Sequence, residues 1–360
     1  MTVFDIKMLG APSASDRVIY LSGDDFEQGR QHGAAAADLM RINLEVIRGQ
    51  LASRKSAGIS SAYTDAANFV ETNQPALWRE FQGMAEGSGL PFEDILTLNL
   101  KVASVLGWLD VECSQIVKVV RNDDGSTRTL MCKTRDQKGG PVEHVVLVRS
   151  YSDGQELLEV QKAGIISYPG SILTSDGFGL GTSGVWCKRT PFDRTRLATA
   201  DIGPNSHQVM RDSKSLDDIE AILAGQPRLT GINYTVARPG DIGAVEVTAS
   251  GARFMRGTDT IIRTNHYLNP DYADLSPRRD EYTSTFHRFD RISQLLPDVQ
   301  SAEDMWHVTQ DHIGYPQDSV CRHRKEGAPG SFTTYASVFV LEERQAYIGF
   351  GNPCEIPFRP

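Results

Sequence analysis

The sequence predicts an α+β fold in which stacked antiparallel sheets are covered by helices. Two observations lead to this class. The first third of the chain has helical periodicity, and short alternating runs of apolar and polar residues begin after residue 112. Helical patterns return later, but without the regular strand–helix–strand alternation of a parallel sheet. No long linker divides the 360 residues, so we expect a mainly helical segment 1–112 and a catalytic portion 113–360 to form one structural domain.

The helices are predicted from apolar residues that recur at helical spacing. The first runs from residue 26 to 55, with Arg and Glu between the apolar positions. A second is predicted from 63 to 84, because Gly83, Gly87 and Gly89 break the pattern there, and Pro91 then opens another helix in its first turn. Two more helical patterns lie near 214–225 and 281–296.

The strands are predicted from alternation and from the turn residues between them. The alternating runs cover residues 114–120, 127–134, 143–151, 157–164, 232–241 and 243–257, and residues 333–351 form a closing hairpin. Asp124 and Gly125 mark the tip of the hairpin that joins the first two runs.

Composition excludes several classes of function. The chain has 37 Lys+Arg against 46 Asp+Glu, a net charge of −9, and no basic cluster interleaved with aromatic residues, so we expect neither a nucleic-acid nor an anionic membrane surface. No apolar run is long enough for a signal peptide or a spanning helix, and we expect a cytoplasmic protein. The 5 cysteines are an odd number and widely spread, which favours reduced thiols over disulfides.

Three further sequence patterns are relevant to cofactor, metal or hydrolase chemistry. The stretch GLGTSG at 179–184 fits a dinucleotide motif by letter, but no helix follows it, so we interpret it as a glycine-rich turn. Cys321 and His323 lie two positions apart while the other histidines are scattered, which is not zinc-site spacing, and we predict no metal and no organic cofactor. No G-x-S-x-G motif supports a serine hydrolase.

Cys113 stands where the helical part ends and the strands begin, in the stretch DVECSQIVKVV. A self-cleaving precursor exposes a new N-terminal residue at such a boundary. An N-terminal cysteine carries both nucleophile and base, because its α-amine, with a pKa of about 7.7 to 8.0, accepts the thiol proton near neutral pH. The alternative for Cys113 alone is an inert buried thiol.

A set of segments in one order favours the nucleophile. They are FEQGRQHG (26–33), GMAEGSGLPFEDILTLNLK (83–101), ECSQ (112–115), TGINYTVARPGD (230–241), RTNHYL (263–268), STFHRFDRISQLL (284–296) and DSVCRH through GFGNPC (318–354). In these the chain resembles the acyl-coenzyme A:6-aminopenicillanic acid acyltransferase-like proteins, the autoproteolytic C45 peptidase family of N-terminal nucleophile hydrolases. The resemblance implies a four-layer αββα fold and a precursor cut at Glu112–Cys113 into an αβ heterodimer.

The resemblance also implies roles for single residues. Cys113 matches the nucleophile, and Asp136 matches an aspartate that aligns the cysteine's amine and thiol. Asn233 matches a side-chain donor to the oxyanion, and Arg288 matches an arginine beside the nucleophile. Taken singly, Asp136 could flank a turn, Asn233 could be an ordinary turn residue, and Arg288 could pair with Asp290 or Glu281 at the surface.

Lys133, Arg135 and Ser175 are the candidate substrate contacts. In a strand, residues 133 and 135 point to one face and Asp136 to the other, so both cations face away from the nucleophile if Asp136 faces it. A bulge beside the site can turn a side chain inward, and we expect Lys133 to reach the pocket and favour a substrate with a carboxylate.

These observations predict an enzyme that acts on a small-molecule amide through a thioester on Cys113, as an amide hydrolase or an acyltransferase. Thiol, amine and oxyanion donors complete this chemistry without a cofactor. The alternative is a non-catalytic binding protein that keeps the fold and is never cut.

Overall fold

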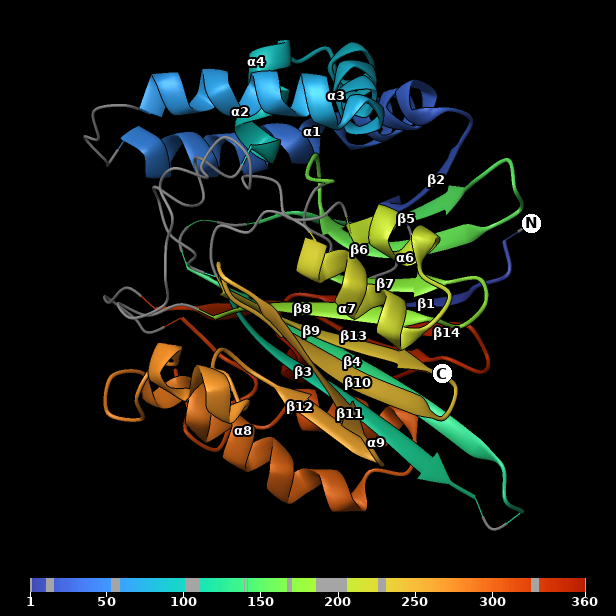
Figure 1. Cartoon of the computed structure of the whole chain (residues 1–360), viewed down its shortest axis with the longest axis vertical. Helices are drawn as coiled ribbons and strands as arrows, with labels where there is room; N and C mark the ends of the chain where they lie inside the picture. Colours follow the sequence, from blue (N-terminus) through green and yellow to red (C-terminus); the bar gives the residue numbers. More distant parts are fainter. Residues whose placement is uncertain are drawn as a thin grey trace.

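The computed structural model describes residues 2–10, 16–52, 59–100, 111–122, 124–138, 140, 142–166, 170–185, 206–225, 231–324 and 330–359. Two sheets stack on each other, and helices cover the outer face of each (Figure 1). The expected α+β class and four-layer αββα sandwich are therefore confirmed.

One sheet has 6 strands and carries most of the candidate site. In spatial order its strands are β1 (Asp5–Leu9), β14 (Gln345–Phe350), β13 (Phe332–Val340), β4 (Thr127–Gln137), β3 (Val111–Arg121) and β12 (Thr260–Arg263). Neighbours are antiparallel except β1 and β14, which are parallel. The predicted hairpins β3–β4 and β13–β14 are both present.

The other sheet has 8 strands. In spatial order they are β11 (Ala252–Gly257), β10 (Asp241–Val247), β9 (Gly231–Arg238), β8 (Gly179–Val185), β7 (Ser171–Thr174), β6 (Glu156–Lys162), β5 (His144–Ser150) and β2 (Val18–Ser22). Strand β2 is parallel to β5. The segment 1–112, expected to be mainly helical, thus also supplies β1 to one sheet and β2 to the other.

The prediction that GLGTSG is a turn is wrong, because residues 179–184 lie within strand β8. Its glycines let the two sheets approach. A Cβ on Gly179 would lie 2.6 Å from Met131 Sδ, and one on Gly181 would lie 2.7 Å from Gln115 Oε1, both on the facing sheet. The remaining inter-sheet core is mostly aliphatic and includes Val117 and Val160. Burying each such side chain contributes about 1.5 to 3 kcal/mol.

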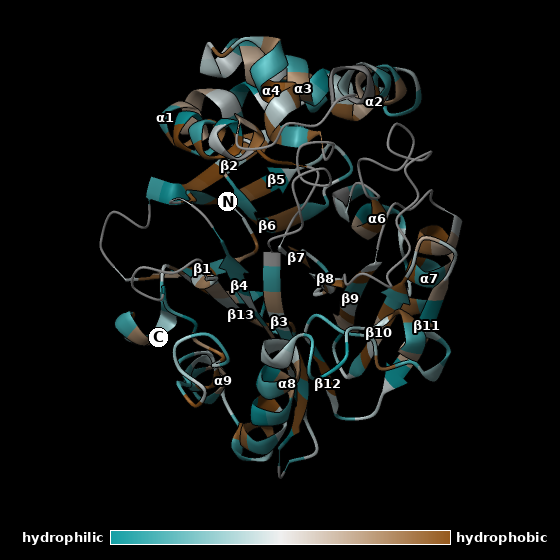
Figure 2. Cartoon of the chain, turned by 90° about the vertical axis from the view of Figure 1, so that its left-hand side faces the viewer, coloured by the Kyte–Doolittle hydropathy of each residue, from teal (hydrophilic) through white to brown (hydrophobic). Residues whose placement is uncertain are grey.

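Four helices form the layer above the 8-stranded sheet: α1 (Asp25–Ala52), α2 (Ile59–Asn73), α3 (Pro75–Ser88) and α4 (Phe92–Asn99). Beneath this layer, strands β2 and β5 are largely hydrophobic (Figure 2). The single helix predicted over 63–84 is in fact two, because Pro75 cannot continue a helix and begins α3 instead.

The prediction that Gly83 and Gly87 break this helix is also wrong. Helix α3 continues through both to Ser88 and ends at Gly89, which has a φ of 67°. A Cβ on Gly83 would lie 1.9 Å from Phe26 O of α1, so this glycine serves close packing of the two helices. In the sequence, a glycine that ends a helix looks the same as one that allows a second helix to pack closely. The position of the partner helix is needed to tell them apart.

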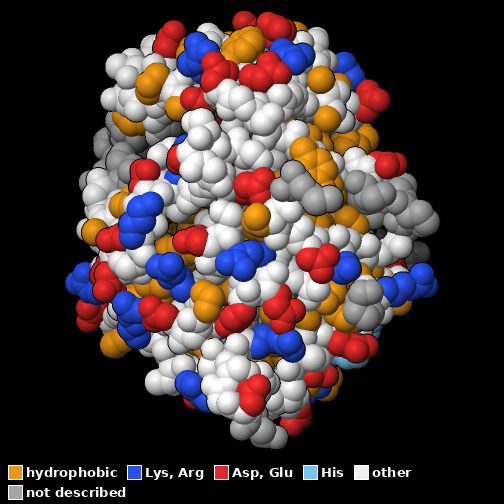
Figure 3. Space-filling model, turned by 90° about the vertical axis from the view of Figure 1, so that its right-hand side faces the viewer, with side chains coloured by type: hydrophobic (Ala, Val, Ile, Leu, Met, Phe, Trp, Pro, Cys, Tyr) orange, Lys and Arg blue, Asp and Glu red, His pale blue; other side chains and the backbone are white. Residues whose placement is uncertain are grey.

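The remaining helices cover the sheets elsewhere. Helices α6 (Ser206–Asp212) and α7 (Leu216–Gly225) pack on the 8-stranded sheet, and α8 (Thr283–Leu295) and α9 (Ala302–Thr309) pack on the 6-stranded sheet. The helices predicted near 214–225 and 281–296 are thus confirmed. No helix in the described ranges has both the length and the apolar character that crossing a membrane requires. On the face shown in Figure 3, acidic and basic side chains are interspersed.

Candidate active site

Cys113 lies near the start of β3, in register with Arg135 of β4, and its neighbour Glu112 is in register with Asp136. Residues paired across an antiparallel ladder project to the same face, and successive residues alternate. Cys113 and Arg135 therefore share one face of the sheet, and Glu112 and Asp136 share the other. All four side chains are buried.

The outer face, which is covered by α8, holds a buried cluster of charge. It consists of Glu112, Asp136, Arg288 and Arg322. Arg322 Nη1 donates to Glu112 Oε2. Arg288 lies 3.6 Å from the carboxylate of Glu112 and 4.0 Å from that of Asp136. We call these residues the Glu112 cluster.

Hydroxyl groups complete the Glu112 cluster. Ser331 Oγ donates to Glu112 Oε1 at 2.9 Å, and Thr333 Oγ1 donates to Asp136 Oδ1 at 2.7 Å. Burial raises the pKa of Asp136 to about 6, while Arg288 and the Thr333 hydroxyl act in the opposite direction. Asp136 is therefore a weaker acid than an ordinary aspartate.

The backbone of Cys113 is held by two side chains. Arg288 Nη1 donates to Cys113 O at 2.7 Å, and the Cys113 N–H donates to Asn265 Oδ1 at 3.2 Å. Arg288 Nη2 donates to the same Asn265 oxygen at 2.7 Å. Arg288 is 0% exposed, which rules out the surface pairing considered above, and Asp290 pairs with Arg279 instead.

Asn265 was missed as a site residue in the sequence. The signal was present, because Asn265 lies in the segment RTNHYL that helps to carry the family resemblance. Its side chain also donates to Gly184 O at 2.8 Å, so its amide is fixed with the oxygen toward Cys113.

Asn233 is buried but is directed elsewhere in the uncut chain. Its amide donates to Thr264 O at 3.3 Å and to His266 O at 2.9 Å. These two carbonyls flank Asn265, so Asn233 fixes the backbone that carries Asn265. In this geometry the donors of Asn233 are used on the backbone and do not point to an oxyanion at Cys113.

Lys133 and Arg135 share the inner face with Cys113. Gln115 shows where this face points, since its side chain donates to Ser183 Oγ of the 8-stranded sheet at 2.7 Å. Lys133 Nζ donates to the carbonyl of Thr182 in the same sheet. Burial lowers the pKa of Lys133, and the nearby Cys113 side chain acts in the opposite direction.

The condition that Asp136 faces the nucleophile is thus not met, and Lys133 lies on the Cys113 side. The expectation was that both cations face away if Asp136 faces the nucleophile, but it is Asp136 that faces away from the Cys113 side. A register shift does occur beside the site, between Thr333 and Tyr335 of β13, opposite Asp136 and Arg135.

Ser175 lies apart from the other predicted residues. It follows β7, where its N–H donates to Glu156 O at 2.9 Å and its carbonyl accepts from Arg344 Nε at 2.7 Å. Because β7 and β8 are antiparallel, this turn lies at the opposite end of β8 from Ser183, which contacts the site. The expectation that Ser175 contacts substrate is not met by this placement.

The cysteines other than Cys113 have different surroundings. Cys132 is buried in the core of the 6-stranded sheet and its helices. Cys113, Cys132, Cys321 and Cys354 are all free, so within the described part of the chain the expectation of reduced thiols holds. Cys187 lies outside the described residues.

Comparison with known proteins gives one family. Residues 207–355 match the family described as acyl-coenzyme A:6-aminopenicillanic acid acyl-transferase. This range is less than half of the chain, and it contains Asn233, Asn265, Arg288 and Arg322 but not Cys113. No curated protein matches the chain.

Among solved structures, penicillin V acylase from Agrobacterium tumefaciens is similar at 11% identity and a TM-score of 0.35, covering 63% of this chain and 80% of that one. The family that the order of the sequence motifs predicts is the one whose model matches residues 207–355.

Proposed function

We propose that the protein is a self-processing cysteine enzyme that cuts its own Glu112–Cys113 bond and then acts on a small-molecule amide through a thioester on Cys113. The family match indicates an acyltransferase or amide hydrolase. The observation that carries the proposal further is the hydrogen bond from the Cys113 N–H to Asn265 Oδ1, which Arg288 also contacts. This nitrogen becomes the catalytic α-amine after cleavage.

In the processing step, the Cys113 thiol attacks the carbonyl carbon of Glu112. The C–N bond breaks, the nitrogen takes up the thiol proton as it becomes the α-amine, and Glu112 is held as a thioester. One water then hydrolyses the thioester and leaves a carboxylate on Glu112 and a free thiol on Cys113. Arg322 and Ser331 hold the Glu112 side chain and so fix the acyl side of the bond.

In turnover, the α-amine takes the proton from the thiol, and the thiolate attacks the substrate carbonyl. A neighbouring cation disfavours a protonated amine, so Arg288 helps to keep the base neutral near pH 7. Asn265 Oδ1 accepts a hydrogen bond from the amine and orients it. Water or an amine then takes the acyl group from the thioester.

The remaining residues support this arrangement. Asp136 supplies the negative charge that Arg288 and Arg322 need in a buried position. Asn233 acts as a positioning residue through Asn265. Lys133 and Arg135 add positive charge on the Cys113 face, which favours a substrate with a carboxylate close to its amide.

The proposal is tested by intact mass and N-terminal sequencing of the purified protein. We expect two chains, the larger beginning at Cys113, and transient acylation of that cysteine by an N-acyl amine substrate. A single chain of 39.7 kDa that is never acylated would instead support the non-catalytic binding protein.

A further inference from the structure

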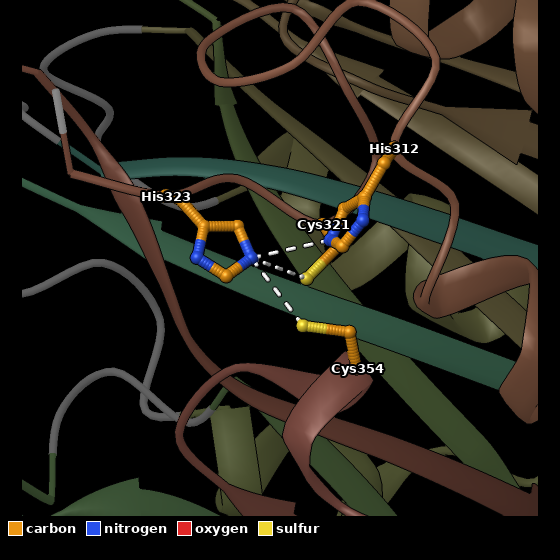
Figure 4. A group of neighbouring side chains, drawn as sticks. All are labelled: His312, Cys321, His323 and Cys354. Carbon is orange, nitrogen blue, oxygen red and sulfur yellow. Dashed lines mark hydrogen bonds between the residues drawn. The ribbon is translucent and has the colours of Figure 1, made fainter.

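Two histidines and two cysteines converge near the C-terminal end of the chain, outside the candidate active site (Figure 4). Their ligand atoms all lie within 4.8 Å of one another. They are His312, Cys321, His323 and Cys354. The first follows α9, the next two precede β13, and Cys354 lies in the short 3-10 turn Pro353–Glu355 after β14.

The three separations from His323 Nε2 to the other ligand atoms are those of a tetrahedral metal site. His323 Nε2 lies 3.2 Å from His312 Nε2, 3.5 Å from Cys321 Sγ and 3.3 Å from Cys354 Sγ. In a tetrahedral zinc site, bond lengths of about 2.0 to 2.1 Å to nitrogen and about 2.3 Å to sulfur separate two nitrogens by about 3.3 Å and nitrogen from sulfur by about 3.5 Å.

Hydrogen bonds alone do not account for this arrangement. His323 Nε2 has three polar neighbours at short range, whereas one ring nitrogen either donates a single proton or accepts with a single lone pair. One cation at the centre of the group satisfies all four atoms at once. The donor set of two imidazoles and two thiolates is the one that zinc prefers for closed, four-coordinate structural sites.

We propose that His312, Cys321, His323 and Cys354 bind one zinc ion in a tetrahedral structural site. All four positions are supplied by the chain, so the ion has no open position for substrate. The linear spacing hides the site, because its ligands come from three segments that only the fold brings together. The prediction of no metal ligation rested on that spacing.

Neighbouring side chains already support the ligand segments. Asn352 Nδ2 donates to Cys321 Sγ at 3.7 Å and to Arg322 O at 2.7 Å. Gln317 Nε2 donates to His323 O at 2.6 Å. Contacts of this kind orient the ligands of a metal site and tune the metal.

The site is joined to the Glu112 cluster through one residue. Arg322 lies between the ligands Cys321 and His323, and its side chain binds Glu112. Its N–H donates to Thr333 Oγ1 at 2.9 Å, the hydroxyl that holds Asp136. The ion would therefore fix Arg322 against the residue that precedes Cys113.

Metal binding is measured first on the full-length protein. We expect about one zinc per chain by inductively coupled plasma mass spectrometry. After chelation, titration with Co²⁺ should give the d–d bands of tetrahedral cobalt and thiolate-to-cobalt charge-transfer absorption. These readouts do not depend on enzyme activity, so they are separate from the proposed function.

Variants then assign the ligands. Cys354→Ser and His312→Ala should each lower zinc content at least tenfold after dialysis against a weak chelator, and His312 is exposed, so its substitution leaves the core intact. The matched controls Cys132→Ala and His307→Ala should keep the full zinc content. The proposal is overturned by a wild-type protein without metal or cobalt charge transfer, by a Cys321–Cys354 disulfide, or by controls that lose as much metal as the ligand variants.

Discussion

Two buried clusters of charge in this molecule look alike in composition but differ in what surrounds them. In the first, Arg149 of β5 donates from Nη2 to Glu80 at 2.7 Å, from Nε to Glu159 at 2.9 Å and from Nη1 to Gln28 at 2.9 Å. This Arg149 cluster joins helices α1 and α3 to the sheet. The second is the Glu112 cluster, beside the candidate nucleophile.

The difference lies in how closely the buried carboxylates are paired with arginine. In the Arg149 cluster, the carboxylates of Glu80 and Glu159 each accept a hydrogen bond from Arg149, at 2.7 and 2.9 Å. In the Glu112 cluster, Arg288 and Arg322 lie 3.9 to 4.0 Å from Asp136, and among the described contacts Asp136 Oδ2 accepts no hydrogen bond. Buried charge alone therefore does not identify an active site. A buried cluster that contains a loosely paired carboxylate and also touches the backbone of the candidate nucleophile is the better sign.

The largest expected effect is that of Cys113→Ala. We expect cleavage to stop and turnover to fall by roughly 10³-fold or more, because one sulfur carries out both attacks. Intact mass and initial rates check this, with Cys132→Ala as the matched cysteine control. Turnover at a tenth of the wild-type level would remove Cys113 from the mechanism.

Arg149→Met should affect stability and not chemistry. It leaves the carboxylates of Glu80 and Glu159 buried without their cation, which costs about 3 to 5 kcal/mol in the free energy of unfolding. Urea denaturation measures this loss, and self-cleavage of the folded fraction should be normal. A stable variant that fails to cleave would show that the Arg149 cluster also serves the site.

Lys133→Met tests whether the positive charge on the Cys113 face of the sheet favours a substrate with a carboxylate. A desolvated charge pair contributes about 2 to 5 kcal/mol when one partner is truncated, so kcat/KM should fall for a carboxylate-bearing substrate and change little for its neutral amide analogue. Steady-state kinetics on the matched pair of substrates give the comparison. Equal losses on both would make Lys133 structural.

The Arg149 cluster should also make stability depend on pH. Burial raises the pKa of Glu80 to about 7 from 4.5, so between these values the folded chain keeps a proton that the unfolded chain releases. The free energy of unfolding should fall as pH rises from about 4.5 to 7, by up to about 3 kcal/mol. Denaturation of wild type and Glu80→Gln across this range isolates the effect, because the variant should lose this slope. An unchanged slope would contradict the assignment.

The smallest expected effects on the mechanism are those of substituting Asn265 and Asn233, and their relative size distinguishes the roles of the two residues. Asn265→Ala removes the acceptor of the amine and should lower kcat by about 10²-fold, a typical cost for one preorganised hydrogen-bonding partner. It should also shift the pH dependence of kcat, since the amine is the base. Asn233→Ala should cost less, with the same direction of shift. If Asn233→Ala costs more, the oxyanion role predicted from the sequence regains support.

The sequence predicted the fold well where local pattern decides it. Alternation and turn residues identified β3, β4 and both hairpins, and helical periodicity identified α1, α7 and α8. The errors at Gly83 and at GLGTSG have one cause. A glycine that allows two elements to pack closely cannot be told apart in the sequence from a glycine that ends an element. The two roles become distinct only when the element packed against the glycine is known.

The candidate site was predictable only where family motifs carry its residues. Cys113 and Arg288 come together as expected, because the family motifs carry them. The face to which Asp136 points depends on strand register, and the grouping of His312, Cys321, His323 and Cys354 depends on contacts between distant segments. No local sequence pattern records either. Asn265 lies between these cases, since its motif was recognised but its role was not.

The pairing of β1 with β14 and of β2 with β5 has a consequence for a nicked chain. After a cut at Glu112, the smaller fragment would remain woven into both sheets and could not diffuse away without unfolding the larger one. Its last two residues, Val111 and Glu112, would still be hydrogen-bonded neighbours of β4. The tail of the fragment would then lie beside the newly formed site. A cut chain would therefore keep the new carboxylate of Glu112 next to the new amine of Cys113 as long as this strand pairing persists.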